Sequence, residues 1–157
     1  MRRSEREVTD NEKINEIIKK CKICRIGFND NGKVYIVPMN FGFEEKQGKK
    51  LFYFHSAKEG RKIDLIKASP YVGFEADTGY ELIEGDTACS YSAAYQSVIG
   101  NGKITFMDSR EDKARALNLI MESATGKNNW GFPPMALDKV CIFCLEIENI
   151  SCKKHIK

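Results

Sequence analysis

The stretch Leu51–Ile63, LFYFHSAKEGRKI, changes from a strand pattern to a helix pattern within a few residues. Its beginning, Leu51–Phe54, is apolar and aromatic, as expected of a strand. The SAKE sequence that follows is a capping box, which predicts a helix with Ser56 at the N-cap and Glu59 at N3. We therefore expect a strand that ends at His55 and passes directly into a helix.

The same stretch has the features of a phosphate-binding site. The N-terminus of a helix offers free backbone N–H groups and a partial positive charge, and Ser56 adds a hydroxyl donor. Arg61 can bind a phosphate bidentately, and Lys62 adds a second cation. The alternative is an ordinary exposed helix start with solvated cations. His55, one of two histidines in the chain, is equally open between a structural hydrogen bond and a ligand contact.

Two further helices are predicted. The first covers residues 10–21, with Asp10 as its N-cap and isoleucines at the spacing of one helix face. The other starts at Asp108 or Ser109 and ends at Gly126, with an apolar stripe of Leu117, Ile120, Met121 and Ala124.

The other segments favour strands at residues 22–28, 33–43, 51–55, 71–76, 95–107 and 139–150. These strands do not alternate regularly with helices, which argues against a doubly wound parallel sheet. Several are joined by hairpins, so we expect a single α+β domain over residues 1–157, built on an antiparallel barrel with helices packed against it. The segment 125–137 is predicted to be an irregular loop.

Composition narrows the class of protein. The chain has 157 residues, of which 42% are hydrophobic and 30% charged, an ordinary globular balance. The formal net charge of +3 does not indicate a nucleic-acid partner. No apolar run approaches the roughly 20 residues of a membrane span, and the charged N-terminus does not resemble a secretory signal. A cytoplasmic protein is therefore expected.

Six cysteines form two C-x-x-C pairs and two single positions: Cys21 and Cys24, Cys141 and Cys144, Cys89, and Cys152. Such pairs are found in zinc sites, but the second pair lies in a strand-like run without a turn, and strand residues three apart point to opposite faces. We expect no metal site and interpret the cysteines mainly as small buried hydrophobic residues. A zinc-binding regulator is kept as an alternative function.

Two more segments suggest a binding site. In VPMN, residues 37–40, a proline interrupts a strand, which places it at a sheet edge or bulge, where free backbone groups can face a flat polar heterocycle. An irregular edge strand without a ligand is the alternative. The second segment is YQSVIGNG, in which Gln96 and Ser97 lie on a strand just before a Gly-Asn-Gly turn.

Taken together, these segments resemble the pyridoxamine 5′-phosphate oxidase-like split-barrel family of flavin-binding proteins, and most closely its Nim group of nitroimidazole-resistance proteins. The resemblance covers nearly the whole chain, from RRSEREVTD through CRIGF, VYIVPMNFGF, FYFHSAKEGRKIDLI and YQSVIGNGKI to the third helix. It implies an antiparallel split β-barrel and a homodimer with a flavin at each subunit interface. The implied cofactor is FMN, with FAD less favoured.

The resemblance also assigns residues to the cofactor. It implies that Arg61 and Lys62 hold the FMN phosphate and that His55 and Ser56 lie beside the cofactor. The strand Val37, Pro38, Met39 and Asn40 would line the isoalloxazine, opposite Gln96 and Ser97. Trp130 is similar to an aromatic residue that reaches the flavin of the partner subunit, with a packing role as the alternative.

The function implied is that of an FMN-dependent oxidoreductase that transfers electrons to a small molecule, such as a nitroaromatic compound. His55 is the candidate catalytic residue, as a proton donor or substrate contact, because imidazole is the side chain whose ordinary pKa lies nearest neutrality. The substrate-binding basic residues of true pyridoxamine-phosphate oxidases have no match in the tail ISCKKHIK. A flavin-binding sensor or carrier without catalysis is the alternative.

Overall fold

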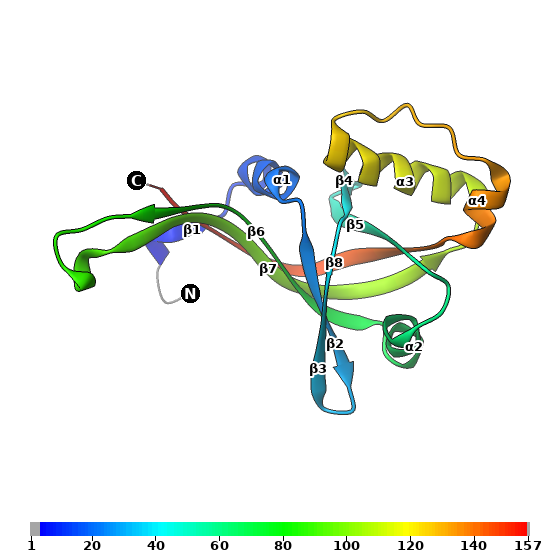
Figure 1. The fold of residues 1–157 in the computed structure, drawn as a ribbon, viewed down its shortest axis with the longest axis horizontal. Helices are drawn as coiled ribbons and strands as arrows, with labels where there is room; N and C mark the ends of the chain where they lie inside the picture. The colour runs from blue at the N-terminus through cyan, green and yellow to red at the C-terminus, as the bar shows by residue number, and fades with distance from the viewer. Residues whose placement is uncertain (1–3, 157) are drawn as a thin grey trace.

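The structure, a computed structural model, describes residues 4–156 (Figure 1). Arg2 and Arg3 of the N-terminal motif lie outside the described residues. The helical elements are η1 (Ser4–Arg6), α1 (Asn11–Lys20), α2 (Arg61–Ala68), η2 (Ala88–Ser90), α3 (Arg110–Thr125) and α4 (Pro134–Lys139). The strands are β1 (Glu7–Val8), β2 (Cys24–Asp30), β3 (Lys33–Met39), β4 (Gly42–Lys46), β5 (Lys49–Ser56), β6 (Tyr71–Ile83), β7 (Ser92–Met107) and β8 (Cys141–His155). No described helix is long and apolar enough to cross a membrane.

One antiparallel sheet organises the chain, in the order β3-β2-β6-β7-β8-β5-β4, with β1 paired to β8. It is an α+β split barrel, as the sequence predicted. In the view of Figure 1, α1, α3 and α4 lie above the strands and the β2–β3 hairpin projects below them. Helix α1 packs against the inner face of the sheet, whereas α3 packs against the opposite face of β5 and β8. Strand β3 is at an edge of the sheet, where the prediction placed Pro38, since an edge strand tolerates a residue that cannot donate to the ladder.

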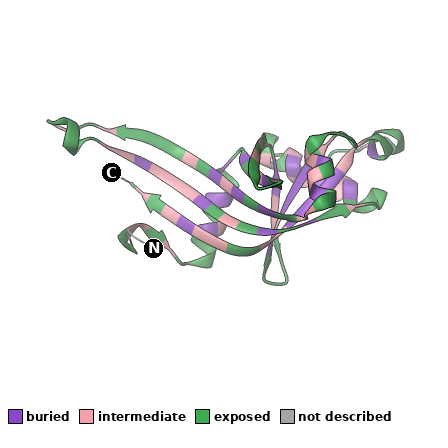
Figure 2. Cartoon of the chain, turned by 90° about the horizontal axis from the view of Figure 1, so that it is seen from below, coloured by how far each residue is buried: buried purple, intermediate pink, exposed green. Residues whose placement is uncertain are grey.

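The main core fills the inner face of the sheet. Alternation of side chains along each strand gives the banded burial seen in Figure 2. On β2, for example, Cys24, Ile26 and Phe28 are buried and the residues between them are not. A second buried cluster, Tyr53, Ala116, Ile120, Ile142 and Cys144, lies between α3 and the opposite face of β5 and β8. These two strands are therefore covered on both faces.

The predicted caps of two helices are confirmed. The Asp10 side chain accepts a hydrogen bond of 2.9 Å from the backbone N–H of Lys13, at the start of α1. Ser109 caps α3 in the same way, through the N–H of Asp112. Gly126 ends α3 in the left-handed conformation, with φ of 75°. The predicted apolar stripe of α3 is only partly right, because Ile120 is buried but Ala124 is exposed.

The predicted capping box is wrong. Strand β5 continues to Ser56, whose backbone pairs with Cys141 of β8, and α2 begins only at Arg61. The N-cap is Gly60, with φ of 127°, and no side chain caps this helix. A glycine reaches this backbone conformation at little steric expense. Ser56, which the local sequence assigned to the helix, therefore belongs to β5, because its backbone pairs with β8.

Several strand boundaries also differ from the predictions. The expected strand 33–43 is two strands, and the break falls after Met39 rather than at Pro38. Strands β6, β7 and β8 extend beyond the predicted ranges because they pair with one another along a projecting arm. The predicted irregular loop, residues 125–137, includes the last residue of α3 and the first part of α4, and the sequence did not predict β1.

A buried lysine attaches α1 to the β4–β5 hairpin. Lys50 is only 9% exposed, and its ammonium group donates to Asn11, Asn15 and the Glu45 carboxylate, the last at 3.0 Å. Asn15 also donates to Glu45, at 2.5 Å. Hydrogen bonds from Asn15, Lys50 and Asn11 lower the pKa of Glu45 to about 2.

We expect this network to make stability depend on pH in the acid range. Because the pKa of Glu45 is lower in the folded chain, its contribution is complete above the ordinary carboxyl pKa and is lost as pH falls towards about 2. In Glu45→Gln the thermal midpoint should be lower at pH 7 and should fall less between pH 5 and pH 2.5 than in the parent protein. Glu16→Gln, on an exposed position of α1, is the matched control. Equal acid dependence in the parent and Glu45→Gln would contradict this role.

Candidate functional site

Arg61, the first residue of α2, lies against the β2–β3 hairpin. Its guanidinium donates to the Asp30 carboxylate at 2.5 and 3.2 Å and lies 4.4 Å from the centre of the Tyr35 ring. The hydrogen bonds to Asp30 raise the pKa of Arg61. These bonds and the ring contact hold the guanidinium in place, with 59% of the side chain still exposed. Lys62 beside it has no carboxylate partner among residues 4–156.

The predicted site residues of β3 lie on two faces. Val37 and Met39 follow Tyr35 on the inward face and pack partly against the core. Pro38 lies on the outer face with Val34 and Ile36, which are 72% and 61% exposed. Arg61 and the inward face of β3 are therefore contiguous through the Tyr35 ring. Asn40 follows the end of β3, and its side chain donates to the carbonyl of Lys22 at 3.2 Å.

Two of the residues predicted to contact the cofactor have a buried side-chain oxygen that makes no hydrogen bond within the described residues. Among the described residues these atoms are Ser56 Oγ and Gln96 Oε1. Ser56 lies at the end of β5 and Gln96 on β7, opposite Thr78 of β6 and Lys154 of β8. A buried oxygen without a hydrogen-bond donor is destabilising unless something else supplies one. Both positions therefore fit contact with a polar ligand.

The remaining predicted residues are exposed or half-exposed. His55 is exposed near the end of β5, where its backbone pairs with Ile142. Ser97 lies on the outer face of β7, the face of Ile99, which is 51% exposed. Strand β7 is three strands from β3, which amounts to roughly 14 Å along the sheet. One chain therefore does not bring Ser97 into contact with Pro38.

Trp130 lies in the segment that connects α3 to α4. Its backbone N–H donates to Asn118 at 2.9 Å, and its indole N–H donates to the carbonyl of Lys127 at 3.0 Å. The ring is 42% exposed. This segment runs along α3, on the opposite side of the sheet from the tip of the β2–β3 hairpin (Figure 1). Trp130 is therefore separated from Arg61 within one chain.

The cysteines do not form a metal site in the described part of the chain, where no three metal-ligating side chains come together. Cys21, Cys24, Cys144 and Cys152 are buried, as expected of small hydrophobic residues, whereas Cys141 is half-buried and Cys89 exposed. Burial raises the pKa of Cys152 to about 11 and that of Cys144 to about 11.

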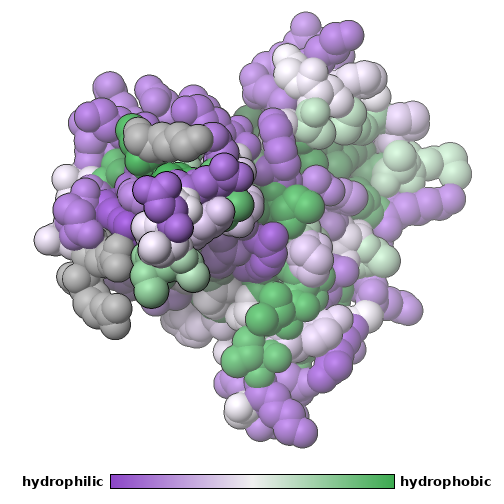
Figure 3. Space-filling view, turned by 60° about the vertical axis from the view of Figure 1, so that its left-hand side comes forward, coloured by the Kyte–Doolittle hydropathy of each residue, from purple (hydrophilic) through white to green (hydrophobic). Residues whose placement is uncertain are grey.

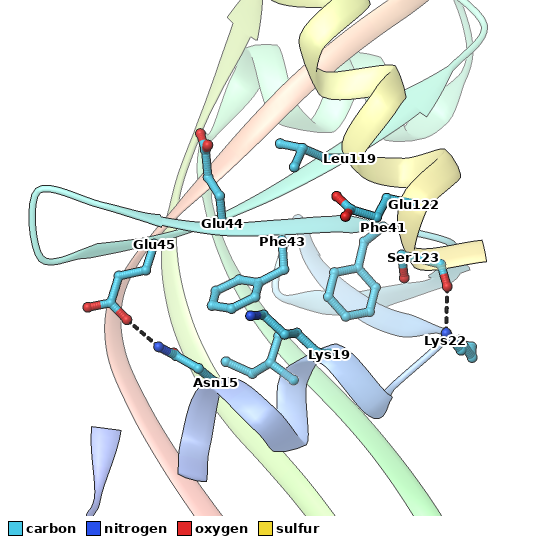
Figure 4. A pocket seen from close by; sticks show the side chains of 11 residues that line it. Asn15, Lys19, Lys22, Phe41, Phe43, Glu44, Glu45, Leu119, Glu122 and Ser123 are labelled. Carbon is cyan, nitrogen blue, oxygen red and sulfur yellow. Dashed lines mark hydrogen bonds between the residues drawn. The ribbon is translucent and has the colours of Figure 1, made fainter. Parts of the chain in front are cut away.

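A cavity of about 490 Å³ lies between α1, β4 and α3 and contains none of the predicted site residues (Figure 4). The three carboxylates on its wall already accept hydrogen bonds, that of Glu122 from Asn128 at 3.2 Å. Glu45 accepts from Asn15, and Glu44 accepts from Arg115 and from the Tyr53 hydroxyl. We therefore assign this cavity no role in the site.

Sequence reasoning missed Asp30 and Tyr35, the two residues that fix Arg61. Asp30 is the last residue of β2, directly before the two-residue turn formed by Asn31 and Gly32. The contact joins residues 31 positions apart, so no local pattern could have indicated it.

Comparison with known proteins identifies similarity over nearly the whole chain. The family model described as pyridoxamine 5′-phosphate oxidase matches residues 10–154. A protein from Bacteroides thetaiotaomicron VPI-5482, provisionally described as a 5-nitroimidazole antibiotic resistance protein, is 30% identical, with a TM-score of 0.81 over 94% of this chain and 85% of that one. No curated protein matches the chain.

Two more distant structures share the fold alone. The flavocytochrome Anf3 from Azotobacter vinelandii has a TM-score of 0.81 at 17% identity, covering 100% of this chain and 72% of that chain. The FAD and heme binding protein from Mycobacterium smegmatis has a TM-score of 0.83 at 13% identity, covering 97% of this chain and 74% of that chain.

Proposed function

The chain belongs to the pyridoxamine 5′-phosphate oxidase family, and from this premise we propose that it is an FMN-dependent oxidoreductase that acts as a homodimer. The observation that carries the proposal is the pair of unpartnered buried oxygens, Ser56 Oγ and Gln96 Oε1. Both belong to residues for which the family resemblance implies a contact with the flavin. Two relatives of the same fold are described as a flavocytochrome and an FAD and heme binding protein, which supports a flavin of some kind.

The phosphate of FMN would lie beside Arg61 and Lys62. Arg61 is held in one position by Asp30 and Tyr35 and still has exposed guanidinium surface. Lys62 follows it in the first turn of α2, where the backbone N–H groups favour an anion. The predicted capping hydroxyl is not part of this arrangement, because Ser56 belongs to β5. The two cations Arg61 and Lys62 suit a terminal phosphate group, which FMN has and FAD does not, so we propose FMN rather than FAD.

The split of the predicted residues between two sheet faces supports a homodimer. Val37, Met39 and Gln96 face inward, whereas Pro38 and Ser97 share the outer face. That outer face carries exposed Val34, Ile36 and Ile99, and apolar surface continues down the projecting hairpin (Figure 3). A second copy packed on this face would bring its own residues to the flavin and cover the apolar side chains.

Flavin supplies the redox chemistry when bound, since it can accept a hydride and pass on electrons. The chain's own residues bind and orient it: Arg61 and Lys62 at the phosphate, and Ser56 and Gln96 with hydrogen-bonding oxygens. His55 is exposed at a strand end and is proposed to donate a proton to the reduced acceptor or to contact it. The similarity to the Bacteroides thetaiotaomicron protein, which is provisionally described as a 5-nitroimidazole antibiotic resistance protein, supports nitroaromatic compounds such as 5-nitroimidazoles as the proposed acceptors.

Turnover distinguishes this function from a flavin-binding sensor or carrier. The flavin-loaded protein would be incubated with NADH or NADPH and a 5-nitroimidazole and compared with the same concentration of free FMN. Consumption of the nitro compound well above the free-FMN rate supports the oxidoreductase. A rate no higher than that of free FMN rejects catalysis and leaves a binding module.

Ser56→Ala tests the observation that carries the proposal. Because Ser56 Oγ makes no hydrogen bond within the described chain, we expect its removal to leave the thermal midpoint of the flavin-free protein unchanged or slightly higher. The same change should weaken FMN binding by about tenfold, equivalent to one hydrogen bond of about 1.4 kcal/mol. Fluorescence titration of FMN measures this. Ser109→Ala is the opposite control, because it removes a helix cap and should lower stability without changing FMN affinity.

A further inference from the structure

A second cavity, of about 400 Å³, lies where α2, the end of β7 and the starts of α3 and β8 meet. It adjoins the strand end that carries the proposed site, because wall residues Cys141 and Ile142 pair with Ser56 and His55. Its size is within the range of small-molecule sites.

Three lysines from separate segments line this cavity: Lys58 before α2, Lys67 in its last turn, and Lys113 in the first turns of α3. All three charges act on the Cys141 thiol in the wall, where they oppose the larger effect of burial, which raises its pKa. The structure therefore brings Lys113, from a distant part of the sequence, to the same cavity as Lys58 and Lys67.

Lys113 is a buried cation without an anionic partner in the described part of the chain. It is only 9% exposed, and its ammonium donates to the carbonyls of Leu137 and Val140 at 3.3 and 3.2 Å. An ammonium has three N–H donors, and a buried charge is expensive unless it is well paired. No carboxylate within residues 4–156 lies within ion-pair distance of any of the three lysines.

Nearby carboxylates leave a positive excess. Asp108 also lines the cavity, and Asp138 is engaged by the Arg110 guanidinium at 2.8 and 2.6 Å. The other wall residues are mainly apolar: Ile63, Phe106, Met107, Val140 and Ile142. The cavity thus offers both cationic and apolar lining residues to one ligand.

We propose that this cavity binds a small organic anion, in which one carboxylate or phosphate group contacts Lys58, Lys67 and Lys113 and an apolar body lies against Phe106 and Met107. The site is distinct from the proposed flavin phosphate site, whose cations are Arg61 and Lys62. The binding does not depend on flavin. Its position beside the strand end of His55 would suit an anionic substrate of the proposed oxidoreductase.

Methyl NMR can locate such binding. Protein labelled at isoleucine and methionine methyl groups would be titrated at fixed ionic strength with benzoate, with phenyl phosphate, and with neutral benzamide. We expect saturable shifts of Met107, Ile63 and Ile142 with the two anions, no shift with benzamide, and no shift of Ile36 on β3. Whichever of the two anions binds with the higher affinity identifies the preferred acidic group, a carboxylate or a phosphate.

Lysine variants test the charge. Lys58→Gln/Lys67→Gln changes two exposed residues, so the fold should persist, and anion affinity should fall at least tenfold. Lys113→Met removes the buried charge and should have the same effect if the protein folds. Lys20→Gln, on the exposed last position of α1, should bind as the parent does.

Three results would overturn the proposal: the absence of saturable shifts, equal shifts with benzamide, or unchanged affinity in Lys58→Gln/Lys67→Gln. The titration would be carried out with and without bound flavin, and the flavin content recorded. Anion binding in protein that takes up no flavin would support the cavity while rejecting the proposed function. Flavin uptake without anion binding would support the flavin site of the proposed function while rejecting the anion-binding cavity.

Discussion

Arg61→Ala/Lys62→Ala should lose most of its FMN. A charge-assisted hydrogen bond to a phosphate contributes about 1.5–3 kcal/mol, so removal of two cations should weaken FMN binding by about 3–6 kcal/mol, roughly 150- to 20,000-fold. The fold should persist, because Arg61 is largely exposed and Lys62 has no carboxylate partner among the described residues. Fluorescence titration of FMN, with circular dichroism as a check of folding, measures the effect.

Asp30→Asn separates phosphate binding from the ion pair. Arg61 is bound to Asp30, so its loss also removes that pair and leaves a carboxylate alone. If the pair alone mattered, Asp30→Asn would lower FMN affinity as much as the double variant does. If Arg61 and Lys62 bind the phosphate, Asp30→Asn should keep most of its FMN, because both cations remain and the Tyr35 ring still contacts the Arg61 guanidinium. Full FMN retention in Arg61→Ala/Lys62→Ala would contradict the phosphate assignment.

His55→Gln should lose turnover while keeping flavin. Glutamine can still form a hydrogen bond but cannot donate a proton as an acid, and a general acid contributes about a hundred- to ten-thousandfold in rate. We therefore expect kcat/KM for a nitroaromatic acceptor to fall by at least about a hundredfold. Because His55 is exposed and makes no hydrogen bond through its side chain within the described chain, stability should change little.

The other histidine supplies the control. His155 lies at the end of β8, where its ring contacts the carbonyl of Ala93 at 2.7 Å and the Arg6 side chain at 3.3 Å. His155→Gln should keep the parent rate. Added imidazole should partly restore turnover in His55→Gly, which a purely structural role would not allow. Unchanged kcat/KM in His55→Gln would remove His55 from the mechanism.

Local signals predicted the parts of the fold that depend on neighbours in sequence. Asp10 and Ser109 cap helices, and Gly126 ends one, because these interactions span only a few residues. The Ser56–Glu59 capping box failed because pairing with Cys141, far along the chain, extends β5. The length of the β6–β7 arm has the same origin, since each strand is extended by its partner.

The site could be predicted only as separate segments. The sequence indicated Arg61 and Ser56, but not that Asp30 and Tyr35 fix the arginine or that the serine hydroxyl is buried without a partner. It also gave no sign that Lys58, Lys67 and Lys113 share a cavity, because the sheet brings together segments that no local pattern connects. The sequence likewise did not indicate that Pro38 of β3 and Ser97 of β7 lie on the same face of the sheet. This becomes clear only from the burial pattern along the two strands in the structure.

The most direct test of the central claim is the absorbance spectrum of the purified protein, followed by chromatography of the cofactor released on denaturation. We predict flavin absorbance bands and release of FMN, close to one per chain after reconstitution. Release of FAD would retain a flavin site but reject the terminal-phosphate assignment to Arg61 and Lys62. A colourless protein that binds no added FMN or FAD would contradict the proposed function.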